Sequence, residues 1–398
     1  MPEKLTIAVF FGGRSPEHDV SIITGLQAIQ AIDPSKFTVL PVYVATDGQW
    51  WTGAPLLDRK NYIPSDAVRA TLTNVTLSIP GHGQRGALTS AAKGLFSKAK
   101  DIPFDVALLA FHGNEGEDGH FQALLEMASI PYTGMRYLAS AVFMDKIITK
   151  DVLARRGVPV LPSWTVTRPA SGLIPDLETV TQATVAATYP LIVKPAHLGS
   201  SIGVARVTNF DDLYAVLPSI LRMDDTVLIE PCVENLEEYN IAVCGFGGDI
   251  RTSAIERPKR TEALLDFKQK YMTGGGKSGG KGPAESSQGM LSLTRDINPV
   301  LPPDLEAKIR NYATVAFRCL APCGAPRIDF LYNTATGELW LNEINPCPGS
   351  FGYFLWEAAA RPLLFSDLLD NLVSEAVGRR GISLGDDPTP PEARLFKR

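Results

Sequence analysis

The stretch that most constrains this chain is residues 325–350, APRIDFLYNTATGELWLNEINPCPGS. Residues 327–330 and 341–345 each alternate polar and apolar side chains, as half-buried strands do, and the NTATG between them is typical of a turn. The pattern therefore predicts a β-hairpin. Because residues two apart share one face of a strand, and because the hairpin should fold symmetrically about its turn, Asp329 is expected opposite Glu343.

The predicted hairpin gathers oxygen atoms that suit a metal ion. Asp329, Glu343 and Asn345 would offer two carboxylates and an amide carbonyl, which are hard ligands suited to Mg²⁺ carrying a nucleotide phosphate. Carboxylates that face each other across a ladder repel, so a positive charge is expected between them. The alternative is the solvated outer face of an edge hairpin, and the spacing alone does not favour either interpretation.

Size and composition narrow the class of protein. A chain of 398 residues usually forms two or three domains. Its 45% hydrophobic content, without an apolar run of ~20 residues, predicts a soluble globular protein without a membrane span. The N-terminal segment is not organised as a signal peptide, and the five cysteines show no disulfide framework and no metal spacing. We therefore expect a reduced, cytoplasmic protein, and the net charge of −5 argues weakly against a nucleic-acid partner.

The N-terminal part is typical of a doubly wound α/β sheet. An apolar strand at 5–11 ends in two glycines, a helix follows that Ser21 could cap, and another strand comes at 38–44. Such sheets bind ligands at the carboxyl ends of their strands, where Glu17 would lie. Two glycines after a strand are weak evidence by themselves.

A second candidate site follows the buried strand at 104–113. This strand ends at His112, and the acidic, glycine-rich turn after it predicts either a substrate site or a helix cap made by Glu117 and Asp118. Taken alone, the turn favours the cap. A single helix is predicted farther on, over residues 139–157, where Gly157 would end it.

The segment 188–207 is predicted as two strands joined by a loop rich in Gly and Ser. Lys194 lies at the end of the first strand, and the loop offers backbone N–H and hydroxyl donors that suit a polyphosphate. Its spacing is neither that of a P-loop nor that of a dinucleotide-binding turn. Glu230, at the end of a later apolar strand, could hold adenine or ribose, although a solvated strand end is the more common case.

Residues 255–292 predict a mobile loop, because the part after Tyr271 is rich in Gly, Ser and Lys and poor in apolar residues. With Lys270 and Tyr271 at its base, the loop could be an active-site lid or a disordered insertion. The GGGKSGG at 274–280 lacks the first P-loop glycine and no strand leads into it, so it is not a P-loop.

These motifs occur in one order along the chain: EHDVS, HG…GEDG, MDK, VKP…GSSIG, KY, RIDF and NEIN…PG. Together they resemble the D-alanine–D-alanine ligase family of the ATP-grasp superfamily, over residues 4–378. The resemblance implies an α/β fold (α+β overall) of the ATP-grasp type. The domains implied are an N-terminal Rossmann-like domain at 1–136, a central ATP-grasp domain at 137–240, a C-terminal ATP-grasp catalytic domain at 241–385 with a lid loop at 264–292, and a tail at 386–398.

The resemblance also implies the reaction. The carboxylate of a first D-alanine attacks the γ-phosphate of ATP, and the amine of a second D-alanine then attacks the acyl phosphate. ATP would lie between the central and C-terminal domains, with two Mg²⁺ ions that Mn²⁺ could replace. The implied partners are ATP and D-alanine, with neither nucleic acid nor membrane, and the family is commonly homodimeric.

The resemblance assigns the roles of individual residues. It implies catalytic roles for Glu17, Ser200, Tyr271, Arg327 and Gly349; contacts with the amino-acid substrates for His112 and Lys270; ATP contacts for Lys146, Lys194, Ser201, Glu230 and Glu238; and metal ligation by Asp329, Glu343 and Asn345. Within this set, Glu17 would orient the first D-alanine's ammonium group. Arg327 and the Gly349 N–H would hold the oxyanion at the acyl carbon.

One segment departs from the family pattern. After Gly349 the sequence is SFGYFLW, whereas the family more often has a small hydroxyl residue near Phe354, touching the second substrate's carboxylate. The second substrate could therefore be D-lactate or another amino acid. Tyr271 favours an amino acid, because depsipeptide-forming relatives tend to lack it. A catalytically silent nucleotide-binding relative is a further alternative, disfavoured because every metal and phosphate position is filled.

Overall fold

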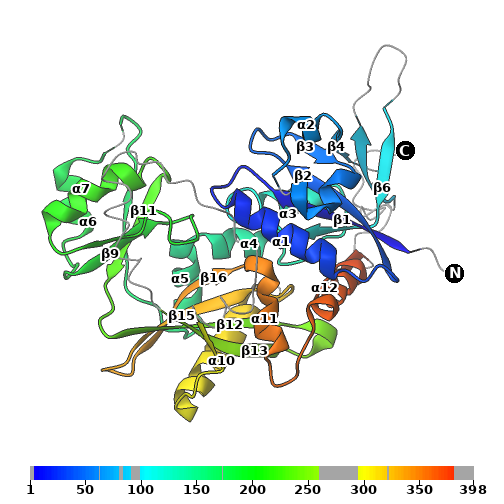
Figure 1. The fold of residues 1–398 in the computed structure, drawn as a ribbon. Coiled ribbons are helices and arrows are strands. Elements are labelled where there is room, and N and C mark those ends of the chain that lie inside the picture. Colours follow the sequence, from blue (N-terminus) through cyan, green and yellow to red (C-terminus); the bar gives the residue numbers. More distant parts are fainter. Residues whose placement is uncertain are drawn as a thin grey trace, which may run out of the picture.

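The computed structural model describes residues 4–61, 63–79, 84–90, 99–172, 174–259, 295–320 and 322–380. Their strands form three sheets, which lie in the N-terminal, central and C-terminal parts of the chain (Figure 1). The expectation of an α/β fold is confirmed, while the predicted domain boundaries stay a prediction. No helix among the described residues combines the length and the apolar character that crossing a bilayer requires.

The N-terminal sheet has the strand order β6-β5-β4-β3-β2-β1-β7. Its strands are β1 (Leu5–Gly12), β2 (Phe37–Val44), β3 (Trp50–Thr52), β4 (Thr73–Ser78), β5 (Gly86–Ser90), β6 (Asp101–Phe104) and β7 (Val106–Leu109). The pairs β1–β2 and β1–β7 are parallel, and the pairs from β2 to β6 are antiparallel. The doubly wound pattern thus covers the β2-β1-β7 end of the sheet, and a meander forms the rest. The helices here are α1 (His18–Ala31), α2 (Asp66–Arg69) and α3 (His120–Met127), with two 3₁₀ turns at Ala54–Leu57 and Arg59–Asn61.

The prediction that Ser21 caps a helix is wrong. Helix α1 already begins at His18, so Ser21 lies inside it and is fully buried. Its hydroxyl accepts the Gly12 N–H at 2.8 Å and donates to the Ala110 carbonyl at 2.8 Å. The side chain therefore joins the ends of two parallel strands to α1, a tertiary role that a local capping rule cannot reveal.

The single helix predicted over 139–157 is also wrong, because the structure has two helices. They are α4 (Tyr137–Met144) and α5 (Lys146–Ala154). Asp145 between them is extended, and its carboxylate accepts the N–H groups of Ile147 and Ile148, so it caps α5. The break makes Lys146 the first residue of a helix.

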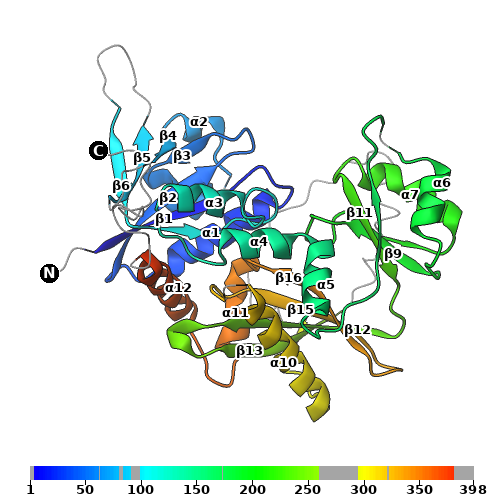
Figure 2. The ribbon, with the colours of Figure 1, turned by 180° about the vertical axis from the view of Figure 1, so that it is seen from behind.

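The central sheet lies at one end of the molecule, and Figure 2 shows it from behind. Its order is β10-β9-β11-β8, with every pair antiparallel. The strands are β8 (Trp164–Thr167), β9 (Leu191–Pro195), β10 (Ala205–Val207) and β11 (Thr226–Pro231). Helices α6 (Leu177–Ala183) and α7 (Phe210–Ile220) pack against it through Val180, Leu213 and Leu217.

The C-terminal sheet has the order β14-β13-β12-β15-β16. Its strands are β12 (Leu236–Cys244), β13 (Arg251–Pro258), β14 (Arg295–Ile297), β15 (Arg327–Asn333) and β16 (Leu339–Asn345), with a 3₁₀ turn at Phe246–Gly248. Helix α10 (Pro303–Cys319) packs on this sheet through Ile309, Ala313 and Phe317. After β16 come a 3₁₀ turn (Gly349–Gly352), α11 (Tyr353–Glu357) and α12 (Phe365–Arg380).

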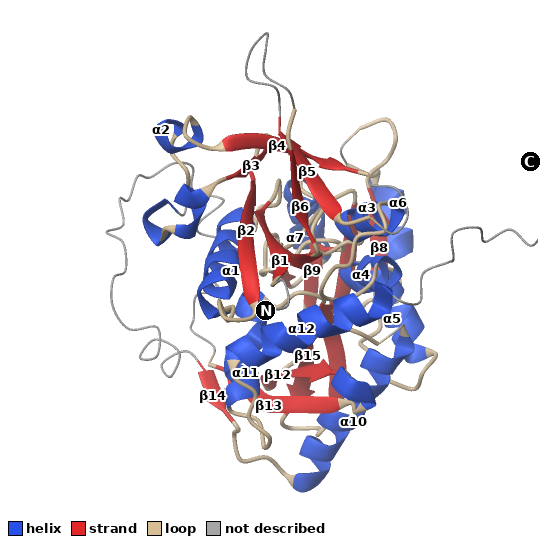
Figure 3. Ribbon diagram, turned by 90° about the vertical axis from the view of Figure 1, so that its right-hand side faces the viewer, coloured by secondary structure: helices blue, strands red, loops and turns tan. Residues whose placement is uncertain are grey.

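Helix α12, the last described element, packs against the first strand, β1. Leu368 and Leu372 of this helix share a hydrophobic core with Ile7 and Val9 of β1 and with Ala242 of β12. The helix thus lies between the N-terminal and C-terminal sheets (Figure 3). The N-terminal sheet therefore buries one face against a helix from the far end of the chain.

Candidate active site

A pocket of about 370 Å³ is lined by residues from all three parts of the chain. Of the predicted site residues, the pocket brings together Glu17, His112, Ser200, Ser201, Glu238, Arg327, Asp329, Glu343, Asn345 and Gly349. Lys146, Lys194 and Glu230 lie behind this lining and are bonded to it or to one another. Lys270 and Tyr271 lie outside the described residues.

The hairpin β15–β16 forms one side of the pocket with the predicted register. Asp329 pairs with Glu343, and Arg327 pairs with Asn345, which confirms the geometry expected from the alternation. The Arg327 guanidinium donates two hydrogen bonds of 2.7 Å to the two oxygens of Asp329. The Asn345 amide donates to Asp329 Oδ2 at 3.0 Å. The facing carboxylates are thus partly neutralised from within the same hairpin.

A second positive charge approaches the hairpin from α5. Lys146 is buried, its Nζ donates to the Leu198 carbonyl at 2.6 Å, and it lies 3.7 Å from Glu343 Oε2. Burial lowers the pKa of Lys146, and Glu343 opposes that effect. Lys146 therefore belongs to the same electrostatic group as the predicted metal ligands.

The residues of the hairpin fit a divalent cation. Burial, with a smaller contribution from the Glu343 carboxylate, raises the pKa of Asp329 to about 6, although Arg327 lowers it. The cluster therefore still lacks positive charge, which a cation beside Asp329 and Glu343 would supply. The amide oxygen of Asn345 would add a neutral ligand of the same hard type.

Behind the pocket, two buried lysines share one buried carboxylate. Lys194 Nζ lies 2.5 Å from Glu230 Oε1, and Lys150 Nζ lies 2.8 Å from Glu230 Oε2. Burial alone would raise the pKa of Glu230, but Lys194 and Lys150 lower it to about 2. Lys194 also donates to Asn342 Oδ1 of β16 at 3.0 Å, so it connects the central sheet to the hairpin. A contact between Glu230 and adenine stays a prediction, and Lys150 was not predicted.

The loop after β9 reaches across the pocket to the N-terminal part of the chain. The Ser200 hydroxyl donates to the Glu17 carboxylate. Ser200 and Ser201 have φ values of 51° and 55°. At Gly199, an added Cβ would lie 3.1 Å from a Glu17 oxygen, so this close approach favours glycine. Glu17 is thereby fixed by a loop 183 residues later in the sequence.

The acidic turn after His112 was predicted mainly as a helix cap, but in the structure it also contributes to the pocket. Helix α3 has no side-chain cap from its N-cap residue, Gly119. Instead, the buried Glu117 carboxylate accepts the N–H groups of Gly113 and Cys347, both at 2.8 Å, and lines the pocket. Burial raises the pKa of Glu117 to about 8 and lowers that of His112 to about 4. The signal that could have found Glu117 was its acidic, glycine-rich turn at a strand's carboxyl end.

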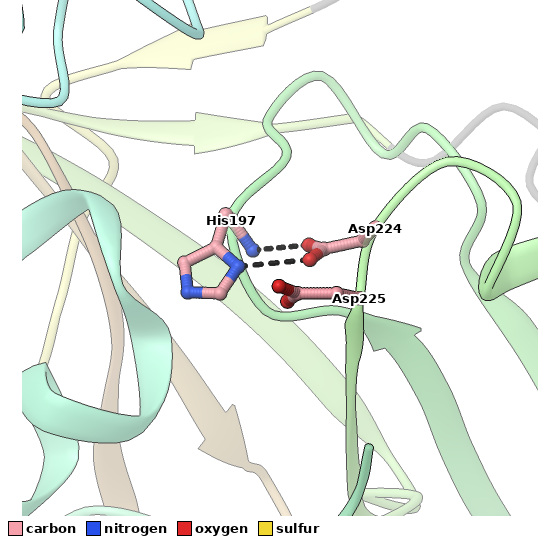
Figure 4. A group of neighbouring side chains, drawn as sticks. All are labelled: His197, Asp224 and Asp225. Carbon is pink, nitrogen blue, oxygen red and sulfur yellow. Dashed lines mark hydrogen bonds and ion pairs between the residues drawn. The ribbon is translucent and has the colours of Figure 1, made fainter. Parts of the chain in front are cut away.

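One other group of described side chains has the composition of a metal site: His197, Asp224 and Asp225 (Figure 4). His197 already donates its backbone N–H to Asp224 at 2.7 Å, and its Nδ1 lies 2.8 Å from the other oxygen. Its Nε2 lies 3.3 Å from Asp145 Oδ2, and the two carboxylates raise the pKa of His197 to about 10. These contacts make His197 a charged link between the Ser200 loop and the cap of α5.

Tyr353 and Phe354, the aromatic residues that depart from the family pattern, are not among the residues that line the pocket. The Arg295 guanidinium lies 4.5 Å from the centre of the Phe354 ring and 3.0 Å from Glu256. Tyr353 stacks on Phe365 with ring centres 4.8 Å apart. A positive charge therefore stands next to the position where the family more often has a small hydroxyl residue.

The α/β fold with three sheets is that of the ATP-grasp ligases. Residues 6–135 match the family model described as D-ala D-ala ligase N-terminus, and residues 152–374 match D-ala D-ala ligase C-terminus. The D-alanine–D-alanine ligase of Thermosipho africanus is 32% identical over 377 residues, which cover 94% of this chain and 93% of that relative. The ligase of Chlorobaculum tepidum is 31% identical, covering 96% and 99%. The chain belongs to the D-alanine–D-alanine ligase family, a family of ATP-dependent ligases.

Solved structures agree with this assignment. The D-alanine–D-alanine ligase from Coxiella burnetii matches with a TM-score of 0.74 and 25% identity, covering 96% of each chain. The VanG D-Ala:D-Ser ligase from Enterococcus faecalis matches with a TM-score of 0.70 and 24% identity, covering 94% of this chain and all of that one. The second likeness concerns the fold alone.

Proposed function

We propose that the protein joins two D-alanine molecules into D-alanyl-D-alanine, with conversion of ATP to ADP and phosphate, and so supplies the dipeptide for peptidoglycan precursors in the cytoplasm. The observation that carries the proposal is the hairpin, where Arg327, Asp329, Glu343 and Asn345 lie together in one pocket. Phosphoryl transfer depends mainly on positioning and on neutralisation of charge, which this cluster can provide.

In this proposal, Asp329, Glu343 and Asn345 hold Mg²⁺, with two ions expected and Mn²⁺ able to replace them. The bound metal would neutralise the phosphate oxygens while the γ-phosphate is transferred. Lys146 and Lys194 are the protein's own cations next to this cluster, and both are buried, so an anion meets their charges with little screening. Ser201 and Glu238 line the pocket, which supports their assignment to ATP.

Glu17 and Ser200, which are hydrogen-bonded to each other, would orient the ammonium group of the first D-alanine, and the neighbouring His112 would contact that substrate. Arg327 would stabilise the oxyanion that forms when the second amine attacks the acyl phosphate. Its guanidinium is already fixed by Asp329, so little reorganisation is needed during the reaction. The Gly349 N–H would be the second donor. The roles proposed for Lys270 and Tyr271 rest on the family resemblance alone.

An alternative keeps the fold and the first step but changes the second substrate to D-lactate or another amino acid. It is favoured by the Arg295–Phe354 pair, which stands where the family more often has a small hydroxyl residue. One of the structural matches is named a D-Ala:D-Ser ligase, so a protein with this fold is named for a different second substrate. We also propose a homodimer, as is common in the family.

The decisive experiment measures ATP-dependent phosphate release with D-alanine alone and identifies the product by mass. We expect D-alanyl-D-alanine, with no turnover when L-alanine replaces D-alanine or when EDTA removes the divalent ion. Turnover only after addition of D-lactate or another amino acid would establish the alternative. No phosphate release with any of these substrates would contradict the proposed function.

A further inference from the structure

Gly349 lines the pocket from the turn Cys347–Ser350, which follows β16. The backbone conformation at the end of this turn is unusual. Ser350, Phe351 and Gly352 have φ values of 52°, 55° and 61°, so three successive residues are left-handed. This region is unfavourable for serine and even more so for phenylalanine. Such a conformation persists only where surrounding contacts hold it.

The contacts that hold this turn come from the N-terminal part of the chain. Glu117 accepts the Cys347 N–H at 2.8 Å, and Thr24 Oγ1 accepts the Ser350 N–H at 3.0 Å. The Ser350 hydroxyl donates to Gln27 Oε1. The backbone bonds to Cys347 and Ser350 lie on either side of Gly349, so the peptide that carries its N–H is fixed from both directions.

Thr24 is well suited to accept the Ser350 N–H. It is buried on α1, and its Oγ1 lies 2.8 Å from His112 Nε2. His112 is neutral at physiological pH, because burial lowers its pKa to about 4. A neutral imidazole can accept the threonine proton at Nε2, which leaves a lone pair of Oγ1 for the Ser350 N–H. The Ser350 N–H can therefore donate to Thr24 Oγ1 while the Thr24 hydroxyl donates to His112 Nε2.

We infer that Thr24 and Gln27 are positioning residues that set the direction of the Gly349 N–H through the Cys347–Ser350 turn. Neither residue lines the pocket, so both act through the turn. The inference rests on the proposed function, in which the Gly349 N–H and Arg327 hold the oxyanion of the second step. Among the described residues no acceptor is bonded to the Gly349 N–H, so this donor is available to a substrate.

The first test is Thr24→Val in the full-length protein. Removal of one oxyanion donor typically costs about 10²–10³ in kcat, and a misdirected donor should cost less, about tenfold. We expect this loss in kcat for dipeptide synthesis, with the KM for ATP within about twofold of wild type, and recovery of most of kcat in Thr24→Ser.

Thr52→Val is the matched control. Thr52 is also a buried threonine, but it lies on β3, and its hydroxyl donates to the Pro41 carbonyl at 2.6 Å, away from the turn. This variant should lose a similar amount of thermal stability while it keeps the wild-type kcat. The inference is overturned if Thr24→Val retains the wild-type kcat, or if Thr52→Val lowers kcat equally.

A second pair of variants avoids the buried core. Gln27→Met should lower kcat by about threefold, since it removes one neutral hydrogen bond to the turn. It should have no further effect in a Ser350→Ala background, where the hydroxyl partner is already absent. Full additivity of the two changes would contradict the coupling between these residues.

Isotope exchange separates the two chemical steps. Movement of ¹⁸O from the β,γ-bridging position of ATP to the non-bridging positions of the β-phosphate, in the presence of D-alanine, reports reversible acyl-phosphate formation and does not require the second attack. We expect near-wild-type exchange in Thr24→Val, because the turn acts on the second step, and equal loss of both rates would overturn the inference. Failure of the proposed function would look different, because wild type would then make no D-alanyl-D-alanine.

Discussion

The two sides of the pocket are built in opposite ways. The hairpin side consists of Arg327, Asp329, Glu343 and Asn345, which one β-ladder aligns. The interdomain side consists of Glu17, Ser200, Glu117 and the Cys347–Ser350 turn, and the hydrogen bonds that join these parts connect residues 183 to 326 positions apart. A ladder holds its side chains wherever the sheet exists, whereas the interdomain side exists only while all three parts of the chain are packed together. Changes on the hairpin side should therefore affect chemistry alone, and changes on the interdomain side should also affect substrate affinity.

The largest effect should come from Glu343→Ala. If Glu343 holds the metal as we propose, loss of its carboxylate should cost about 4 kcal/mol of transition-state stabilisation, or about 10³-fold in phosphate release, with an unchanged circular dichroism spectrum. Glu338→Ala, in the turn of the same hairpin, is the control and should keep wild-type turnover. Near-normal phosphate release by Glu343→Ala would remove Glu343 from the metal site.

Arg327→Lys should lower kcat for dipeptide synthesis by about 10²-fold. Lysine keeps the charge but cannot reproduce the two parallel bonds to Asp329, so the donor that we propose for the oxyanion would be misplaced. Arg310→Lys provides the matched control, because Arg310 also bonds to a carboxylate, Glu306 of α10, but away from the pocket. Equal kcat values for wild type and Arg327→Lys would show that charge alone suffices at this position.

On the interdomain side, Ser200→Ala should lower kcat/KM for D-alanine by about tenfold, chiefly through KM. A hydrogen bond to a charged group contributes about 1.5 kcal/mol, and its loss lets Glu17 move. Ser219→Ala, whose hydroxyl bonds only to its own helix, should behave as wild type in steady-state kinetics. If Ser200→Ala reduced kcat alone, the contrast between the two sides of the pocket would not hold.

The smallest effect concerns stability and pH. The pKa of His197 is raised from 6.5 to about 10 by Asp145 and Asp224, so the folded protein keeps this proton at a pH where the unfolded chain loses it. The stabilisation is complete below pH 6.5 and is lost as the pH rises toward 10. The Tm of wild type should therefore decline over this range more steeply than that of His197→Asn.

His120→Asn is the control for that comparison, because His120 also pairs with an aspartate, Asp118 at 2.9 Å, but its side chain is 78% exposed. Its Tm profile should follow that of wild type. Parallel profiles for wild type and His197→Asn would mean that the His197 link contributes nothing to stability.

The same contrast explains how much could be predicted from sequence. The register of Asp329 with Glu343 follows from a period of two and a turn, which are local signals, and it was confirmed. The capping role of Ser21 and the preference for a helix cap at Glu117 were mistaken, because these side chains bond to segments about 90 and 230 residues away. Lys150 was missed for the same reason, since its carboxylate partner lies on β11. Local rules therefore capture the hairpin side but not contacts between sheets.

Helix α12 has a consequence for the time course of folding. Its Leu368 and Leu372 complete the core beneath Ile7 and Val9 of β1, which the ribosome releases long before α12. At a synthesis rate of about 5–20 residues per second, the first strand waits about 20–70 s for its last partner. During that interval, an apolar face of a nearly finished sheet is uncovered. That face is therefore open to wrong contacts with other chains until α12 has been synthesised and has packed.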